Sequence, residues 1–368
     1  MVRTREVFLR PGEILIKERE LPELKPYEIL VRTHQASICG SERYYYRGVL
    51  VKPEDEARHR YIPSKYRKKP SHGETAGEWS SASPLGHEGG GTVIETGSAV
   101  GEYVYHPGHK IQVGDRVGNL GGWPTYSDYG VVSNLQGIQP IPDGVPMEIG
   151  CLYEPFGCAG FAALHMGAMP GDVVTVNGCG FAGMMLIQGA LKHGASMIIG
   201  VDIVDRKLMN AGKLVAKYKA KYRAVNPKKE DYNRVINELT DDEGVDVACD
   251  CVGGTGIGVK QSLDQVRHNG TLALYGDNYA KYPDFSFNRF HEDGLQIRNL
   301  NAMHYNELSS IMNCYEAYRA QVRGVFDEVW PIVWENSSTH TLNEIANVFS
   351  DESKSLDQQA SIKTVIKP

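Results

Sequence analysis

The sequence predicts an α/β protein made of a doubly wound parallel sheet and a second, mostly β domain. Strand and helix patterns alternate between residues 173 and 300, which is typical of parallel strands joined by crossover helices. The first 150 residues instead contain short runs of alternating polarity separated by proline and glycine, the pattern of short strands. A chain of 368 residues is long enough for two such domains.

Composition and charge exclude several classes of protein. Apolar residues make up 41% and charged residues 23%, and the net charge of −6 comes without a long run of one sign. We therefore expect neither nucleic acid nor a membrane as a partner. No stretch approaches ~20 apolar residues and the first ten residues are charged, so we expect no signal peptide and a cytoplasmic location. Seven cysteines, an odd number, favour reduced thiols over a disulfide framework.

The first domain is predicted from short strands with polar motifs on the loops between them. Cys39-Gly40-Ser41-Glu42 follows one strand and Gly86-His87-Glu88 precedes another, so both place polar side chains beside an apolar context. Pro11-Gly12 marks a turn. The expected strands include Glu13–Ile16, Tyr27–Thr33, Gly91–Thr96, Arg116–Gly118 and Tyr129–Val132.

The second domain begins with a glycine turn between a strand and a helix. Gly178, Gly180 and Gly183 have the spacing G-x-G-x-x-G. The first glycine allows a tight turn, the second lets the backbone approach a pyrophosphate, and the third lets the helix pack closely on the strand. The N–H groups of the first helical turn, at Phe181 and Ala182, would face the phosphates. The expected elements are a strand at Asp172–Asn177, a helix at Phe181–His193 and a strand at Ser196–Val201.

An acidic residue closes the second of these strands. Asp202 stands nineteen residues past Gly183, where a carboxylate can accept hydrogen bonds from a ribose 2′-hydroxyl and repel a 2′-phosphate. This favours NAD over NADP. Three spaced glycines alone would suit a plain structural turn, but the complete strand, helix, strand and aspartate pattern favours dinucleotide binding.

Further strands and helices complete the expected parallel sheet. Val252 and Tyr275 come at strand ends on the edge where a cofactor lies, so we expect them near the nicotinamide, although packing alone would also explain them. The expected elements are helices at Arg206–Tyr218, Asp231–Leu239, Lys260–Arg267 and His304–Tyr318, and strands at Tyr222–Val225, Asp246–Cys251, Gly270–Gly276 and Leu295–Leu300.

Several separated motifs together resemble the zinc-dependent medium-chain dehydrogenase/reductase family, which contains alcohol, sorbitol and threonine dehydrogenases. They occur in the family's order and span nearly the whole chain. The matching segments are Ile38-Cys39-Gly40-Ser41, Gly86-His87-Glu88-Gly89, Val113-Gly114-Asp115-Arg116-Val117, Glu154-Pro155, the glycine turn, Thr341-Leu342-Asn343-Glu344-Ile345 and Lys363-Thr364-Val365-Ile366-Lys367-Pro368.

The resemblance implies a domain layout and an assembly. Residues 1–154 would form a GroES-like catalytic β domain, residues 155–300 a Rossmann NAD-binding domain, and residues 301–368 a return segment that completes the catalytic domain. The family also implies a homodimer or homotetramer.

The resemblance further implies a catalytic zinc ion, whose usual ligands are thiolate, imidazole and carboxylate with one position left open. Cys39 and His87 would bind it together with Glu88 or Glu154. Glu154 matches the glutamate of the family's polyol-dehydrogenase branch, and Glu88 matches a glutamate that ligates directly or swings out when substrate arrives. In isolation, Cys39 would suit a small buried apolar residue and His87 a structural histidine.

The same resemblance implies roles in ligand orientation and proton transfer for three residues near Cys39. Glu42 stands where the family usually has an aspartate that orients the histidine ligand, although an exposed loop carboxylate is an equal alternative. Ser41 matches the hydroxyl that takes the alcohol proton, or else it bonds to the backbone as a loop serine. Tyr44 replaces the histidine that ends the proton relay in some members.

The chain departs from the family's pattern in two segments. Gly118–Tyr129 contains no cysteine, so the usual four-cysteine structural zinc lobe is missing and one zinc ion per chain follows. Cys39 and His87 are also 48 residues apart, about twice the common separation, which indicates an insertion at about 47–84. The insertion contains a basic run, Lys65–Lys69. It could cover the active site, recognise an anionic substrate, form a solvated surface loop or contact another subunit.

The predicted function is oxidation of a secondary alcohol, a polyol or sugar-derived hydroxyl, to a ketone with NAD. Glu154 motivates the polyol class, while an anionic polyol, an amino alcohol and a cyclic alcohol stay open. The alternatives are a zinc-free quinone or enoyl reductase of the same superfamily and a non-catalytic nucleotide-binding protein.

Overall fold

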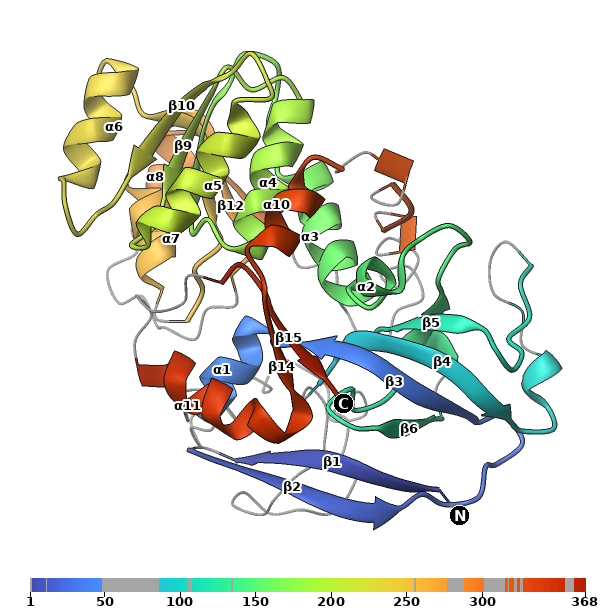
Figure 1. The fold of residues 1–368 in the computed structure, drawn as a ribbon. Helices are drawn as coiled ribbons and strands as arrows, with labels where there is room; N and C mark the ends of the chain where they lie inside the picture. The colour runs from blue at the N-terminus through green and yellow to red at the C-terminus, as the bar shows by residue number, and fades with distance from the viewer. Residues whose placement is uncertain are drawn as a thin grey trace. The chain divides into compact units, whose positions relative to one another are not determined.

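The computed structural model describes two compact units (Figure 1). The first comprises Met1–Glu154, Thr339–Leu356 and Thr364–Pro368, and the second comprises Pro155–Ser338 and Asp357–Lys363. The domain limits and domain roles expected above stay predictions. The described residues are 2–10, 12–47, 86–102, 104, 108–133, 135–254, 256–276, 288–300, 315–316, 318–320, 323–324, 327–354 and 361–368.

The first unit is rich in antiparallel strands. Strands β1 (Arg3–Arg10) and β2 (Glu13–Glu20) form a hairpin. A seven-stranded sheet has the order β14-β15-β3-β4-β5-β7, with β6 paired to β3. Its strands are β3 (Ile29–Ser37), β4 (Glu88–Thr96), β5 (Arg116–Asn119), β6 (Tyr129–Val132), β7 (Ile138–Pro140), β14 (Ser338–Thr341) and β15 (Thr364–Lys367).

Short helices and two apolar clusters complete this unit. One cluster packs β3 and β4 residues such as Val31 and Val93 around Trp123, and the other packs Tyr126 against Phe349. The burial of these side chains on the sheet fixes the strand register, because a shift by one residue would turn each of them outward. The helices are α1 (Gly40–Tyr46), α2 (Met147–Gly150) and α11 (Ile345–Lys354), with 3₁₀ turns at Val100–Glu102, Leu135–Gly137 and Leu342–Glu344.

The second unit contains a six-stranded parallel sheet in the order β10-β9-β8-β11-β12-β13. Numbered from its first strand, this is the order 3-2-1-4-5-6 of a doubly wound sheet, whose strand order reverses between β8 and β11. The strands are β8 (Val173–Asn177), β9 (Met197–Val201), β10 (Lys221–Val225), β11 (Val245–Asp250), β12 (Val266–Leu274) and β13 (Gln296–Asn299).

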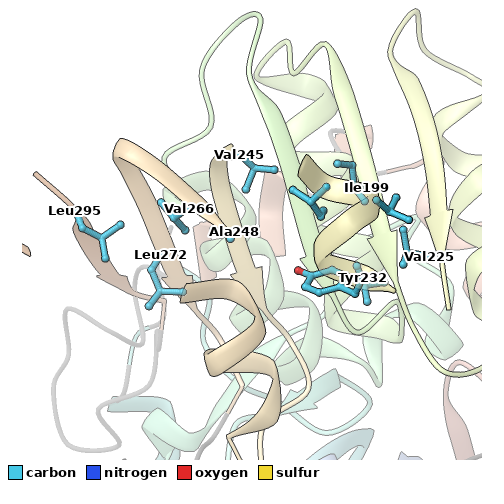
Figure 2. Close-up of a cluster of buried hydrophobic side chains, with 11 residues drawn as sticks. Ile199, Val225, Tyr232, Val245, Ala248, Val266, Leu272 and Leu295 are labelled. Atoms are coloured by element: carbon cyan, nitrogen blue, oxygen red, sulfur yellow. The ribbon is translucent and has the colours of Figure 1, made fainter. Parts of the chain in front are cut away.

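Helices surround this sheet, and apolar side chains fill its core. Figure 2 shows Tyr232 of a helix among strand residues that include Ile199, Val225 and Leu272. The β-branched residues of the strands suit this buried, pleated surface. The helices are α3 (Tyr153–His165), α4 (Phe181–Lys192), α5 (Asp205–Val215), α6 (Tyr232–Thr240), α7 (Ile257–Leu263), α8 (Asn288–Glu292) and α10 (Val329–Glu335).

The predicted α/β class, a parallel sheet with a strand-rich second part, is confirmed. One predicted element is wrong: the helix expected at Lys260–Arg267 ends at Leu263, and β12 already begins at Val266. The polar Arg-His-Asn run that follows Val266 hides the β pattern of that strand. The insertion and most of the helix expected at His304–Tyr318 lie outside the described residues. Among the helices that the structure describes, none is long and apolar enough to span a membrane.

Candidate metal centre

Three side chains of metal-binding type converge in the first unit. A sulfur of Cys39, a ring nitrogen of His87 and a carboxylate oxygen of Glu88 all lie within 4.8 Å of one another. Cys39 follows β3 and Glu88 begins β4, and these antiparallel neighbours pair Ser37 with Glu88. The end of one strand therefore lies beside the start of the other, which brings together residues 48 positions apart in the sequence.

The carboxylate of Glu42 contacts the imidazole ring of His87. The Glu42 side chain is fully buried in α1, and its Oε1 lies 3.2 Å from Nδ1 of His87. The same carboxylate accepts hydrogen bonds from the backbone N–H of Gly86 at 2.6 Å and of Cys39 at 3.1 Å. A histidine held by a carboxylate at one ring nitrogen presents the other nitrogen to a metal, so this contact suits a ligand-orienting role.

The group contains more acidic than basic side chains. Burial would lower the pKa of His87, but the negative charges of Cys39 and Glu42, and hydrogen bonds to both, raise this pKa well above its usual 6.5. Glu88 adds a third acidic group, and its carboxylate accepts a hydrogen bond from the hydroxyl of Ser37. A buried excess of negative charge is costly unless a cation balances it. One sulfur, one nitrogen and one oxygen donor are the ligand types of zinc, so these residues fit that ion.

The second candidate carboxylate, Glu154, is placed differently. It is buried in the first turn of α3. It is not a member of the three-residue group that the described part of the chain forms. Of the two acidic candidates, the structure therefore brings Glu88 to Cys39 and His87, and Glu154 as a ligand stays a prediction.

The other predicted residues of this region lie on α1. Ser41 is the second residue of the helix and Tyr44 the fifth, and both are half-buried. Their roles in proton transfer stay predictions. The sequence does not single out Ser37, whose hydroxyl binds Glu88. It offers Tyr126, whose hydroxyl binds Glu42, only as the end of the segment 121–126, which replaces the zinc lobe and is expected to shape the substrate pocket.

The glycine turn of the second unit lies at the point where the strand order reverses. Gly178 has a φ of 93°, which favours glycine, and its N–H donates to the carbonyl of Val201 at 2.7 Å. Gly183 packs so closely that an added Cβ would lie 1.8 Å from the Gly178 oxygen. Gly180 precedes the first residue of α4. The turn therefore has the close backbone packing that a dinucleotide site uses.

Asp202, just after β9, holds this turn in place by hydrogen bonds. Its carboxylate accepts from the N–H of Cys179 at 2.8 Å and from the N–H of Val204 at 2.9 Å. These two bonds fix the direction of the carboxylate. The turn and the acidic residue thus lie together, as the sequence pattern predicts for a ribose-binding aspartate.

Val252 and Tyr275 follow the carboxyl ends of β11 and β12, on the same edge of the sheet as the glycine turn. Asp250 at the end of β11 organises both segments. Its carboxylate accepts from the N–H of Val252 at 3.0 Å, and its carbonyl accepts from the N–H of Tyr275 at 3.0 Å. Contact of either residue with nicotinamide stays a prediction.

Comparison with known proteins points to one group of enzymes. Residues 182–317 match the family model described as zinc-binding dehydrogenase. An L-threonine 3-dehydrogenase of Anaeromyxobacter sp. (strain K) is 28% identical over 303 residues, which cover 76% of this chain and 77% of the relative. A sorbitol dehydrogenase of Bacillus subtilis is 25% identical over 293 residues, 72% of each chain. The crystal structure of 2R,3R-butanediol dehydrogenase from Bacillus subtilis has the same fold, with a TM-score of 0.71, 21% identity and 99% of each chain covered.

Proposed function

We propose that this homologue of the zinc-binding medium-chain dehydrogenases is a zinc-dependent, NAD-linked dehydrogenase that oxidises a secondary alcohol to a ketone. The observation that carries the proposal is the convergence of Cys39, His87 and Glu88. Three donors of different type in a buried group leave an open position on a four-coordinate ion, which is the arrangement of a catalytic zinc site.

Cys39, His87 and Glu88 would hold the zinc ion, with Glu154 as a further candidate. Zinc bound there supplies a Lewis acid that lowers the pKa of an alcohol hydroxyl. Glu42 would keep the ring of His87 oriented. Ser41, two residues past the cysteine, would take the alcohol proton and pass its own hydroxyl proton on. The glycine turn and the first turn of α4 would bind the pyrophosphate of NAD, and the cofactor would supply the hydride acceptor.

Asp202 supports NAD rather than NADP. Both oxygens of its carboxylate are held by backbone N–H groups, so the negative charge stays at the end of β9. A ribose 2′-phosphate would meet that charge, whereas a 2′-hydroxyl can donate to it. We expect activity with NAD to exceed activity with NADP, and Asp202→Ala to reduce the difference.

The relatives support two candidate substrate classes. The sorbitol dehydrogenase supports a polyol or sugar-derived hydroxyl, and the threonine dehydrogenase keeps an amino alcohol as the second candidate. NADH production measured across a panel of polyols, amino alcohols and simple secondary alcohols separates these classes.

Replacing the thiolate ligand tests the metal centre. We expect the purified chain to bind one zinc ion, and Cys39→Ala to lose most of the zinc and of the NAD-linked oxidation, because a thiolate ligand disappears. Elemental analysis and NADH absorbance measure both. Cys249→Ala is the matched control, since Cys249 is a buried thiol of β11 in the other unit. Retained zinc and undiminished oxidation in Cys39→Ala would contradict the proposal.

The same measurement separates the competing functions. A zinc-free quinone or enoyl reductase would contain no zinc and would oxidise a reduced cofactor, with NADPH preferred. A nucleotide-binding protein without catalysis would bind NAD and turn over no alcohol in the panel. The homodimer or homotetramer implied by the family stays a prediction, which solution scattering can test.

A further inference from the structure

We propose that Tyr126 is a positioning residue of the metal centre, because its hydroxyl holds the Glu42 carboxylate that orients His87. The inference rests on the proposed function, since it concerns the geometry in which a zinc ion is bound. Tyr126 lies in a loop between β5 and β6, and its side chain is 2% exposed.

The Glu42 carboxylate accepts from four donors. Oε1 lies 2.6 Å from the N–H of Gly86 and 3.2 Å from Nδ1 of His87. Oε2 accepts from the N–H of Cys39 and from the hydroxyl of Tyr126. Four donors fill the capacity of a carboxylate. Three of these donors belong to the segments that carry the proposed metal ligands. The fourth donor, the hydroxyl of Tyr126, lies outside those segments.

The hydrogen bond from Tyr126 matters because residue 42 is a glutamate. Glutamate is one methylene longer than aspartate and has one more rotatable bond, so its carboxylate needs an additional contact to keep one position. The Tyr126 hydroxyl gives that contact as a charge-assisted hydrogen bond, and the carbonyl of Ser37 lies 3.2 Å from the same hydroxyl.

Tyr126 is itself held in place. Its ring packs edge-on against Phe349, with ring centroids 6.4 Å apart, and its carbonyl accepts from the N–H of Val7 at 3.0 Å. The hydroxyl therefore approaches Glu42 from a fixed point in the core of the first unit. A fixed donor limits the movement of the carboxylate and, through it, of the His87 ring.

The end of β5 and the loop that follows it also bind the backbone of the ligand segment. The side chain of Asn119 donates to the carbonyl of His87 at 2.9 Å. Thr125 donates from its N–H to the carbonyl of Gly86 at 2.6 Å, and its hydroxyl lies within hydrogen-bond distance of the carbonyls of Gly86 and Glu88. All three carbonyls of Gly86–Glu88 are thus bound by residues 119–125. This loop stands where the resemblance would place the structural zinc lobe.

The test is the removal of one hydroxyl. Tyr126→Phe keeps the ring and its packing. Loss of a group that contacts a metal ligand directly costs about 10- to 100-fold in affinity, and Tyr126 is one contact further out, so we expect zinc affinity to fall by about tenfold at most. Competition with a chromophoric chelator measures the affinity. In cobalt(II)-substituted protein we expect the visible d–d absorption to shift, since it reports ligand geometry and a purely structural loss would leave it unchanged.

A control and a double variant isolate the contact. Tyr232→Phe removes a buried tyrosine hydroxyl from the second unit, so we expect wild-type zinc affinity and cobalt absorption. Combining Tyr126→Phe with Glu42→Gln should cost less zinc affinity than the product of the two single effects, because both variants disturb one hydrogen bond.

The outcomes separate this inference from the function on which it rests. Wild-type protein that binds no zinc overturns the proposed function. Zinc-binding wild type with unchanged affinity and cobalt absorption in Tyr126→Phe overturns the role of Tyr126 alone. If Tyr126→Phe does not fold, 4-aminophenylalanine at position 126 replaces it: the ring and its size are kept, the donor to Glu42 is weaker, and unchanged zinc affinity and cobalt absorption in that variant overturn the inference.

Discussion

At the scale of single residues, the glycines of the nucleotide turn differ in what a side chain would meet. A Cβ at Gly183 would lie 1.8 Å from a backbone oxygen, whereas a Cβ at Gly180 has no heavy atom within 4 Å among the described residues. Gly180 also has an ordinary negative φ of −74°. Gly183 is therefore required for packing, and Gly180 leaves space for a ligand.

Alanine at these two positions should separate stability from binding. We expect Gly183→Ala to lower the free energy of unfolding by about 1–3 kcal/mol, because helix α4 must move away from β8. Gly180→Ala should change it by no more than about 0.5 kcal/mol and still weaken NAD binding, because its methyl group occupies the approach to the pyrophosphate. Urea unfolding and calorimetric titration with NAD measure the two effects. Equal NAD affinity in Gly180→Ala and wild type would contradict the assignment of the turn.

The sequence motifs, through the family resemblance, point to the clustered residues Cys39, His87 and Glu88 but not to what surrounds them. Cys39, His87 and Glu88 stand in short motifs beside predicted strands, so the sequence points to them. The partner of Glu42 does not stand out, because Tyr126 is 84 positions away and its hydroxyl meets the carboxylate only after the strands have paired. Hydrogen bonds between residues so far apart in the sequence depend on tertiary packing, which local residue patterns do not reveal.

At the scale of elements, an ion pair fastens the first strand to the loop before β6. The guanidinium of Arg5 donates to both oxygens of Asp128, at 2.6 and 3.0 Å, and the N–H of Arg5 donates to the same carboxylate at 2.8 Å. Burial would raise the pKa of Asp128, but these bonds to Arg5 lower it below its usual 3.8. The hairpin β1–β2 thus depends on a carboxylate that is ionised in the folded chain.

The sign of this pKa shift predicts acid sensitivity. A carboxyl group whose pKa is lower in the folded state stabilises the fold above its unfolded pKa, and that contribution disappears as pH falls through the folded pKa. We expect Asp128→Asn to cost about 1 kcal/mol at pH 7 and to match wild type at a pH below the folded pKa. Denaturant unfolding at several pH values measures the difference. The exposed pair Arg3–Glu20 provides the control, because Glu20→Gln should change little at any pH.

Element prediction succeeded where periodicity was uninterrupted. The strands and helices from β8 to β11 follow from alternating buried runs and amphipathic segments, and each was expected within a few residues of its observed bounds. The error at α7 and β12 arises where polar residues, Arg267 to Asn269, interrupt a strand that its neighbours complete. Pairing with β11 decides that element, and local propensity does not.

At the scale of the whole molecule, the two proposed ligands belong to different compact units. The residues for zinc lie in the first unit and those for NAD in the second. Each unit has its own apolar core. A ligand that binds only the folded form stabilises the unit that holds its site, by about 2.7 kcal/mol at one hundred times the dissociation constant.

Hydrogen exchange should therefore resolve the two ligands by region. We expect removal of zinc by a chelator to accelerate exchange in the ends of β3 and β4, and NAD to slow exchange in the turn between β8 and α4. Mass spectrometry of peptides from each unit measures both effects. Acceleration spread evenly over both units after zinc removal would contradict this placement of the metal.

The Glu42 carboxylate has a consequence for the variability of the enzyme. It ties the peptide at Cys39 to the peptide at Gly86, so these two points of the chain are held together whatever the length of sequence between them. Doubling the length of such an excursion costs only about 0.6 kcal/mol of chain entropy. We expect a graft that replaces residues 48–85 with a different sequence to retain one zinc ion per chain. Loss of the metal in every such graft would contradict this. Retention would mean that the metal site tolerates divergence in the sequence that separates its ligands.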